Sequence, residues 1–274
     1  MIITQPDKTN QRRELAEKMY YNYFKSGTCL YAKRCLLNTT KGYHSSRALR
    51  IGENYDFEIN GIPTRILFMG KESPADEATK AIPRTATLVE VAEDWALSHN
   101  GEKRVNLHYQ ETYKMLCYML NYNPSQIRLF RDREDNVLQY FALTNRYRCK
   151  QDDGRTHITN NYEQKTNCLK ILQEEIHIMR PTIIVLQLQE TTSKDLFSDD
   201  KNLSIKLNDA DAERVVYSPK YECYVVETIH PNTRGAWWKH KPKFIKSIDY
   251  LKNIGVLPSK TIDLTEEINK WVKP

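Results

Sequence analysis

Residues 137–150, VLQYFALTNRYRCK, and residues 167–188, NCLKILQEEIHIMRPTIIVLQL, decide the fold of this chain. The first run predicts a strand that ends at Asn145, with Cys149 four residues further on. In the second run, Cys168 opens a helix that leads into another apolar strand. Because open α/β sheets bind ligands at the carboxyl ends of their strands, Asn145 is a candidate ligand-binding side chain next to a pair of cysteines.

The rest of the chain continues this alternation of helices and strands. Helices are expected at residues 10–25, 85–98, 110–121 and 161–179, and strands at residues 65–70, 137–145, 182–188 and 221–230. Strands separated by helices pair in parallel through right-handed crossovers. The sequence therefore predicts an α/β fold: a three-layer α/β/α sandwich with a central, mostly parallel, four-stranded sheet. No linker composition interrupts it, so we expect one domain over residues 1–274.

Composition bounds the function. The 41 Lys and Arg residues exceed the 35 Asp and Glu residues, which gives a net charge of +6. Basic groups interleaved with aromatic residues suit a nucleic-acid backbone with stacked bases, although a solvated basic face explains the charge equally well. The apolar runs are too short to span a bilayer and the N-terminus does not resemble a signal peptide, so we expect a soluble, cytoplasmic protein. We also expect a monomer that binds DNA.

The six cysteines fall into two kinds. Cys117 and Cys223 lie in apolar stretches, where a thiol packs as a small hydrophobic group. The other four form two pairs, and thiolates in such pairs can bind an iron-sulfur cluster or a zinc ion. These four are Cys29, Cys35, Cys149 and Cys168.

Polar residues follow three of the expected strands. Glu72 and Asp76 follow the first strand, Asn145 ends the second and His230 ends the fourth. The carboxyl ends of parallel strands meet at one edge, so a carboxylate, an amide and an imidazole converge there. Such a set can hydrolyse the glycosidic bond of a base that is held by its polar edge.

Three motifs in this order, MGKESP at residues 69–74, LTNRYRC at 143–149 and TIHPNTR at 228–234, resemble the uracil-DNA glycosylase superfamily, and within it the iron-sulfur branch. The resemblance covers roughly residues 29 to 250. It implies a DNA glycosylase that flips a pyrimidine out of DNA and hydrolyses its N-glycosidic bond, leaving an abasic site. In cells such an enzyme acts in base excision.

The resemblance assigns roles to individual residues. Asn145 would hydrogen-bond the polar edge of the flipped pyrimidine, and His230 would stabilise the charge that develops on it. Glu72 would activate water or stabilise the sugar cation, with Asp76 as the alternative. A 4Fe-4S cluster would be bound by Cys29, Cys35, Cys149 and Cys168, with zinc or no metal as the alternatives.

The chain departs from the family pattern at two motifs. The first turn is one residue longer before its proline, and the first cysteine pair is spaced C-x5-C instead of C-x2-C. A long insert also precedes the residue expected to stack on the base, for which Tyr109 is the candidate and His108 the second choice. A reshaped pocket suggests a modified cytosine, hydroxymethylated or glucosylated as in phage DNA, and a role in antiviral defence. Uracil excision in repair is the alternative.

Several residues are expected to contact DNA. A side chain after the His-Pro turn would wedge into the duplex as the base leaves, and the basic residues would bind phosphates. The candidates are Arg234, Trp237, Lys239, Arg146 and Arg148. Two other classes stay open: a non-catalytic protein that binds DNA lesions, and a zinc-stabilised interaction module. A phosphate-binding loop is excluded because residue 65 is Arg and Glu72 follows Lys71.

Overall fold

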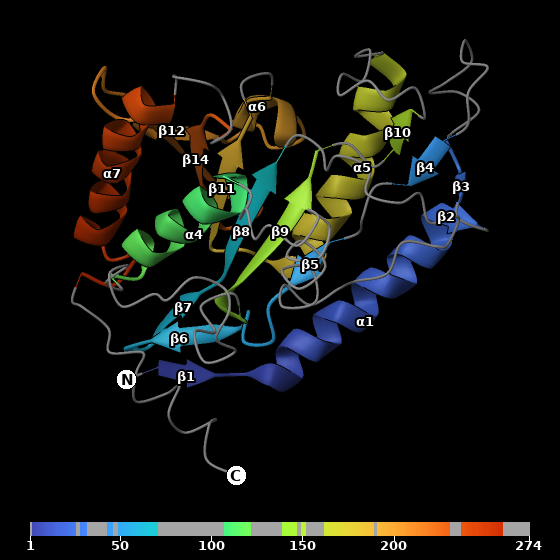
Figure 1. The fold of residues 1–274 in the computed structure, drawn as a ribbon, viewed down its shortest axis with the longest axis horizontal. Helices are drawn as coiled ribbons and strands as arrows, with labels where there is room; N and C mark the ends of the chain where they lie inside the picture. The colour runs from blue at the N-terminus through green and yellow to red at the C-terminus, as the bar shows by residue number, and fades with distance from the viewer. Residues whose placement is uncertain are drawn as a thin grey trace, which may run out of the picture.

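The computed structural model describes residues 2–25, 28–31, 43–45, 49–70, 107–121, 139–146, 149–151, 162–188, 191–230 and 237–259. A seven-stranded sheet in the order β12-β13-β14-β11-β8-β9-β5 runs through the middle of this part of the chain (Figure 1). Its strands are β5 (Arg50–Ile51), β8 (Ile66–Gly70), β9 (Phe141–Asn145), β11 (Ile183–Gln187), β12 (Ser204–Leu207), β13 (Arg214–Ser218) and β14 (Cys223–Thr228).

The four strands expected from the sequence are β8, β9, β11 and β14, and they are neighbours that pair in parallel. The expectation of a four-stranded sheet was wrong, because β5 pairs antiparallel with β9 and β13 pairs antiparallel with β14 and β12. The added strands are short or carry many polar residues, so they lack the continuous apolar run of a strand that is buried on both faces. The fold class is α/β with a mixed, mostly parallel sheet.

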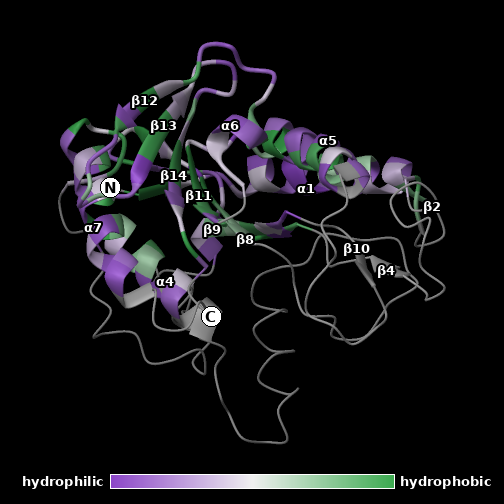
Figure 2. Cartoon of the chain, turned by 90° about the horizontal axis from the view of Figure 1, so that it is seen from above, coloured by the Kyte–Doolittle hydropathy of each residue, from purple (hydrophilic) through white to green (hydrophobic). Residues whose placement is uncertain are grey.

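Helices cover both faces of the sheet, which makes three layers (Figure 1). Helices α4 (Leu107–Met119) and α7 (Trp237–Asn253) pack on one face, against Phe68, Val185 and Val226. Helices α1 (Pro6–Tyr23), α5 (Tyr162–Met179) and α6 (Ser193–Leu196) pack on the other. Successive strand residues point to opposite faces, so each parallel strand contributes to both cores. Figure 2 shows the apolar strands enclosed between these helix layers.

Three helices lie close to their expected ranges, and the fourth, expected over residues 85–98, lies outside the described residues. Helix α1 begins four residues earlier than expected, with Gln5 as its N-cap. Pro6 occupies the first turn, where its missing N–H costs no hydrogen bond. No described helix combines the length and the apolar composition that crossing a bilayer requires.

A second sheet lies at the amino ends of the parallel strands. Strands β1 (Ile2–Thr4), β6 (Phe57–Ile59) and β7 (Ile62–Thr64) pair antiparallel, and β7 leads directly into β8. The β6–β7 turn is Asn60-Gly61, with φ of 51° and 80°, and positive φ at both residues is typical of a type I′ hairpin turn. This sheet therefore fixes the entry into the first parallel strand.

Two short ribbons lie near the N-terminal end of α5 (Figure 1). In one, β2 (Phe24–Lys25) pairs with β3 (Thr28–Cys29), and in the other, β4 (Tyr43–Ser45) pairs with β10 (Cys149–Gln151). They follow the carboxyl ends of α1 and β9, so the chain places both on the side of the molecule that carries the expected cysteines.

Candidate functional site

A row of five residues crosses the sheet at the carboxyl ends of the parallel strands, on the face covered by α4 and α7. The register pairs Asn145 with Gly70 and Gln187 with Thr228. One residue beyond the last pair of β8 and β11, Gly70 lies beside Gln187. One residue beyond the last pair of β13 and β14, Glu213 lies beside Thr228. We call Asn145, Gly70, Gln187, Thr228 and Glu213 the polar row. The residues two positions deeper on each strand are apolar core residues: Leu143, Phe68, Val185, Val226 and Val215. The polar row therefore marks where the core ends and a site can begin.

Asn145 ends β9, and the residue is only 6% exposed. Among the residues that the structure describes, its amide has no hydrogen-bond partner. Its register partner is Gly70, which has no side chain. A glycine in a strand often marks the place where a ligand approaches the backbone closely. A buried amide next to such a glycine can bind the polar edge of a small planar molecule.

The last residue of β11, Gln187, is buried and joins the polar row to α4. Its Nε2 atom donates to Thr112 Oγ1 at 3.0 Å and lies 3.3 Å from Met115 Sδ. Glu111, also buried, precedes Thr112 and forms a 2.6 Å ion pair with Lys114. None of these residues was predicted to belong to the site. A glutamine that ends an apolar strand was a usable signal, but its pairing with α4 depends on the register of the sheet.

At the other end of the polar row, Glu213 contacts both β14 and α7. Its Oε1 atom accepts a hydrogen bond from Thr228 Oγ1 at 3.4 Å and lies 2.7 Å from His240 Nδ1. Burial raises the pKa of Glu213, against the opposing effects of His240 and of the Lys243 charge. Sequence reasoning missed this carboxylate because it precedes a strand that was not expected.

The described residues expected in the active site or at the DNA surface take different positions. His230 is half-buried, two residues after the end of β14, and Lys239 is exposed in the first turn of α7. Arg146 is buried, and its Nη2 atom donates to the Lys165 carbonyl of α5 at 3.0 Å. His108 and Tyr109 lie in the first turn of α4, and Trp237 begins α7, but their side chains are not described. The remaining candidates lie outside the described residues: Glu72, Asp76, Arg148 and Arg234.

Two of the expected metal ligands are buried on neighbouring elements. Cys29 is 8% exposed at the end of β3, and Cys168 is 4% exposed in the second turn of α5. Lys170 Nζ lies 5.7 Å from the centroid of the Tyr31 ring, so the segment that follows Cys29 approaches α5 two residues after Cys168.

The other two expected ligands are described less fully. Cys149 is the register partner of Ser45, although its side chain is not described, and Cys35 lies outside the described residues. Among the described side chains, no three metal-binding residues form a group. Cys117 and Cys223, expected to be core residues, are both fully buried, in α4 and at the start of β14.

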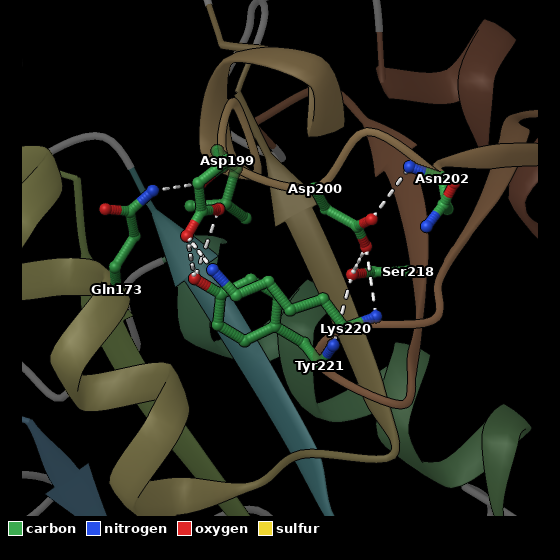
Figure 3. Close-up of polar contacts among 8 residues, drawn as sticks. Gln173, Asp199, Asp200, Asn202, Ser218, Lys220 and Tyr221 are labelled. Atoms are coloured by element: carbon green, nitrogen blue, oxygen red, sulfur yellow. Dashed lines mark hydrogen bonds and ion pairs between the residues drawn. The ribbon is translucent and has the colours of Figure 1, made fainter.

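A second polar cluster lies at the opposite end of the strands, where β13 ends and β14 begins (Figure 3). Asp200 accepts hydrogen bonds from the Ser218 hydroxyl at 2.5 Å and from the Asn202 and Lys220 amides at 2.9 and 3.1 Å. Asp199 pairs with Lys220 and accepts a hydrogen bond from Tyr221. Both carboxylates therefore stabilise the turn between β13 and β14, and we assign this cluster a structural role.

No protein-family model matches the chain, and no curated protein shows significant similarity to it. The α/β fold and the polar row are therefore the observations on which an assignment of function rests.

Proposed function

We propose that the chain is a DNA glycosylase of the uracil-DNA glycosylase type, with its active site at the polar row. The observation that carries the proposal is the buried amide of Asn145, which faces no hydrogen-bonding partner among the described residues and ends a strand next to Gly70. A polar side chain in such a place can form hydrogen bonds with a ligand that enters the site. The polar edge of a flipped pyrimidine offers the donors and acceptors that an asparagine amide needs.

The arrangement of the neighbouring strands supports the reaction. Gly70 is the register partner of Asn145, and Glu72 follows Gly70 by two residues in the sequence, which supports a role for this carboxylate near Asn145. His230 follows β14, the outer of the four parallel strands on the other side. Water, activated by Glu72, attacks the sugar carbon, and the bond between sugar and base breaks. His230 stabilises the negative charge on the departing base, which finally takes up the proton that the water gives up.

We also propose that the four cysteines bind a 4Fe-4S cluster with a structural role. The supporting observation is the burial of Cys29 and Cys168 on adjoining elements, with the β4–β10 ribbon of Cys149 close to the same end of α5. When bound, the cluster would cross-link these segments behind the site. Cys29, Cys149 and Cys168 would hold it together with Cys35.

The substrate class proposed is a modified cytosine in phage DNA, which makes the protein part of antiviral defence. The longer turn at Glu72 and the insert before Tyr109 support a wider pocket than uracil needs. The absence of a side chain at Gly70, the register partner of Asn145, supports a close approach of the base to the backbone there. Uracil in DNA is the alternative substrate, and the experiment below distinguishes the two.

The test is to incubate the purified protein with uracil-containing, unmodified and hydroxymethylated or glucosylated DNA and to identify released bases by mass. Asn145→Ala and Glu72→Ala should each lower the rate by about 10²-fold or more, as the loss of a catalytic group does. Asn253→Ala, at the exposed end of α7, is the control and should keep the wild-type rate. Release of uracil alone assigns repair. DNA binding without the release of any base contradicts the glycosylase and assigns a lesion-binding protein.

A further inference from the structure

The connection between β14 and α7 begins with His230 and ends at Trp237, and Glu213 contacts the elements on both sides of it. On the strand side, Thr228 donates to Glu213 Oε1 two residues before His230. On the helix side, His240 lies against the same oxygen, in the first turn of α7. One carboxylate oxygen therefore links the end of the strand to the start of the helix.

The backbone of Glu213 also binds α7. Its N–H group donates to the Lys243 carbonyl at 3.3 Å, and its carbonyl accepts a hydrogen bond from the Ser247 hydroxyl at 2.7 Å. Glu213 thus contacts α7 at three successive places along one side of the helix. These contacts hold the helix to the start of β13 independently of the apolar core beneath.

The first turn of α7 needs such support because of Pro242. A proline inside a helix has no N–H group, so the carbonyl of Trp238 loses its partner in the next turn. The turn that carries Lys239 and His240 is therefore held by fewer helix hydrogen bonds than an ordinary first turn. The pair formed by His240 and Glu213 replaces part of that lost restraint.

We infer that Glu213 is a positioning residue that fixes His230 relative to the first turn of α7, and so aligns the imidazole with the base. The role of His230 in this inference rests on the proposed glycosylase function. The described charged or titratable groups that face the carboxylate are His240 and Lys243, both from α7, while β14 contributes only the neutral hydroxyl of Thr228. We call the contacts of Glu213 with Thr228 and with His240 the two arms of the Glu213 clamp. Loss of either arm should loosen the start of α7 without removing any group that contacts DNA.

The experiment uses the full chain and three variants. His240→Ala removes the contact of Glu213 with the helix, and because the His240 side chain is half-exposed the core stays intact. Glu213→Gln keeps the shape of the side chain but removes its charge. Asp211→Asn is the matched control, because Asp211 also pairs with α7, through Lys246 at 3.3 Å, but its side chain is 76% exposed. The first readout is amide hydrogen exchange of peptides that cover residues 237–247.

Exchange in this segment should become about tenfold faster in His240→Ala and Glu213→Gln and stay unchanged in Asp211→Asn, as expected for the loss of one charge-assisted hydrogen bond. The second readout is base release, whose kcat should fall about tenfold in the first two variants while the Kd for DNA stays within about twofold. Unchanged exchange in His240→Ala would overturn the clamp. If wild-type protein releases no base from any DNA, the proposed function fails, yet the exchange result still decides whether Glu213 holds the helix.

Discussion

Thr144 donates a 2.7 Å hydrogen bond to Glu175, a carboxylate with no exposed surface. The other oxygen of this carboxylate accepts a hydrogen bond from the Tyr20 hydroxyl, which itself accepts one from the Leu49 amide at 2.9 Å. Helices α1 and α5 are thereby tied to the residue that precedes Asn145. Because Thr144 and Asn145 point to opposite faces of β9, the carboxylate fixes the end of the strand from behind the proposed site.

We therefore expect Thr144→Val and Tyr20→Phe each to lower the free energy of unfolding by about 1–3 kcal/mol, since each removes a hydrogen-bond donor to a buried carboxyl group. The double variant should lose less than the sum of the two, because both hydroxyls serve one carboxylate. Urea denaturation of the four proteins gives the coupling energy. Strict additivity would show that Glu175 does not connect the two hydroxyls.

Much of the fold could be predicted from the sequence because its four parallel strands are short apolar runs between helical patterns. Strands β8, β9 and β11 are buried along their whole length and have polar residues only at their carboxyl ends, and in β14 only Tyr224 and Glu227 are partly exposed. The outer strands could not be predicted in the same way. Strand β12 is half-exposed, and β5 has only two residues, so neither has the apolar pattern of the inner strands.

The same distinction applies to the candidate site. Asn145 and His230 stand out because Asn145 ends an apolar strand and His230 follows one by two residues, and the parallel pairing of the strands puts both strand ends on the same side of the sheet. Gln187 and Glu213 take part through contacts with α4 and α7 that depend on how the helices pack. Local sequence contains no record of such contacts between residues far apart in the chain.

Asp200 should make stability depend on pH in the acid range. Burial alone would raise the pKa of Asp200, but the hydrogen bonds from Ser218, Asn202 and Lys220 and the charge of Lys220 outweigh it and lower the pKa from the ordinary 3.8. A lowered pKa stabilises the fold above the ordinary value, and this stabilisation is lost as the pH falls through and below it. Asp200→Asn should cost about 2 kcal/mol at neutral pH and make the loss of stability below about pH 4 less steep.

The comparison for Asp200 is Asp209→Asn, an exposed carboxylate that accepts a hydrogen bond from the Asp211 amide at 2.8 Å. This variant should stay within about 0.5 kcal/mol of wild type and keep the wild-type acid dependence. Thermal unfolding between pH 3 and 7 measures both proteins. Equal acid profiles for the two variants would show that Asp200 contributes nothing to the pH dependence.

Lys252 should stabilise the carboxyl end of α4. Its Nζ atom donates to the Tyr118 carbonyl at 2.8 Å and to Asn121 Oδ1 at 2.6 Å, and lies 4.0 Å from the centroid of the Tyr118 ring. Burial lowers the pKa of Lys252 because it disfavours the charged ammonium group. The carbonyl, the amide oxygen and the ring stabilise that charge in its buried position. Lys252→Met should cost about 2 kcal/mol in urea denaturation. Lys246→Met, which removes an exposed ion pair on the same helix, should change stability by less than about 1 kcal/mol.

Gly61 and Gly255 test the cost of a left-handed backbone without any change in packing. Gly61 lies in the β6–β7 turn with φ of 80°, and Gly255 follows the end of α7 with φ of 77°. The Gly255 amide donates to the Lys252 carbonyl and the next amide to the Leu251 carbonyl, which closes the helix. An added Cβ meets nothing within 4 Å at either glycine, so Gly61→Ala and Gly255→Ala should each cost about 1 kcal/mol. A loss beyond about 3 kcal/mol at either site would mean that packing matters there after all.

Cys168 and Cys223 provide a matched pair for the proposed cluster. Both thiols are buried, but Cys168 lies on α5 against the segment after Cys29, whereas Cys223 begins β14 in the core, where burial raises its pKa. A thiolate ligand must lose its proton, which the surroundings of Cys223 oppose. Cys168→Ser should therefore lower the iron content and the visible absorbance of the purified protein, while Cys223→Ser keeps both and loses only stability. Iron and absorbance that survive in Cys168→Ser would exclude this thiol as a ligand, and zinc in place of iron would assign the alternative metal.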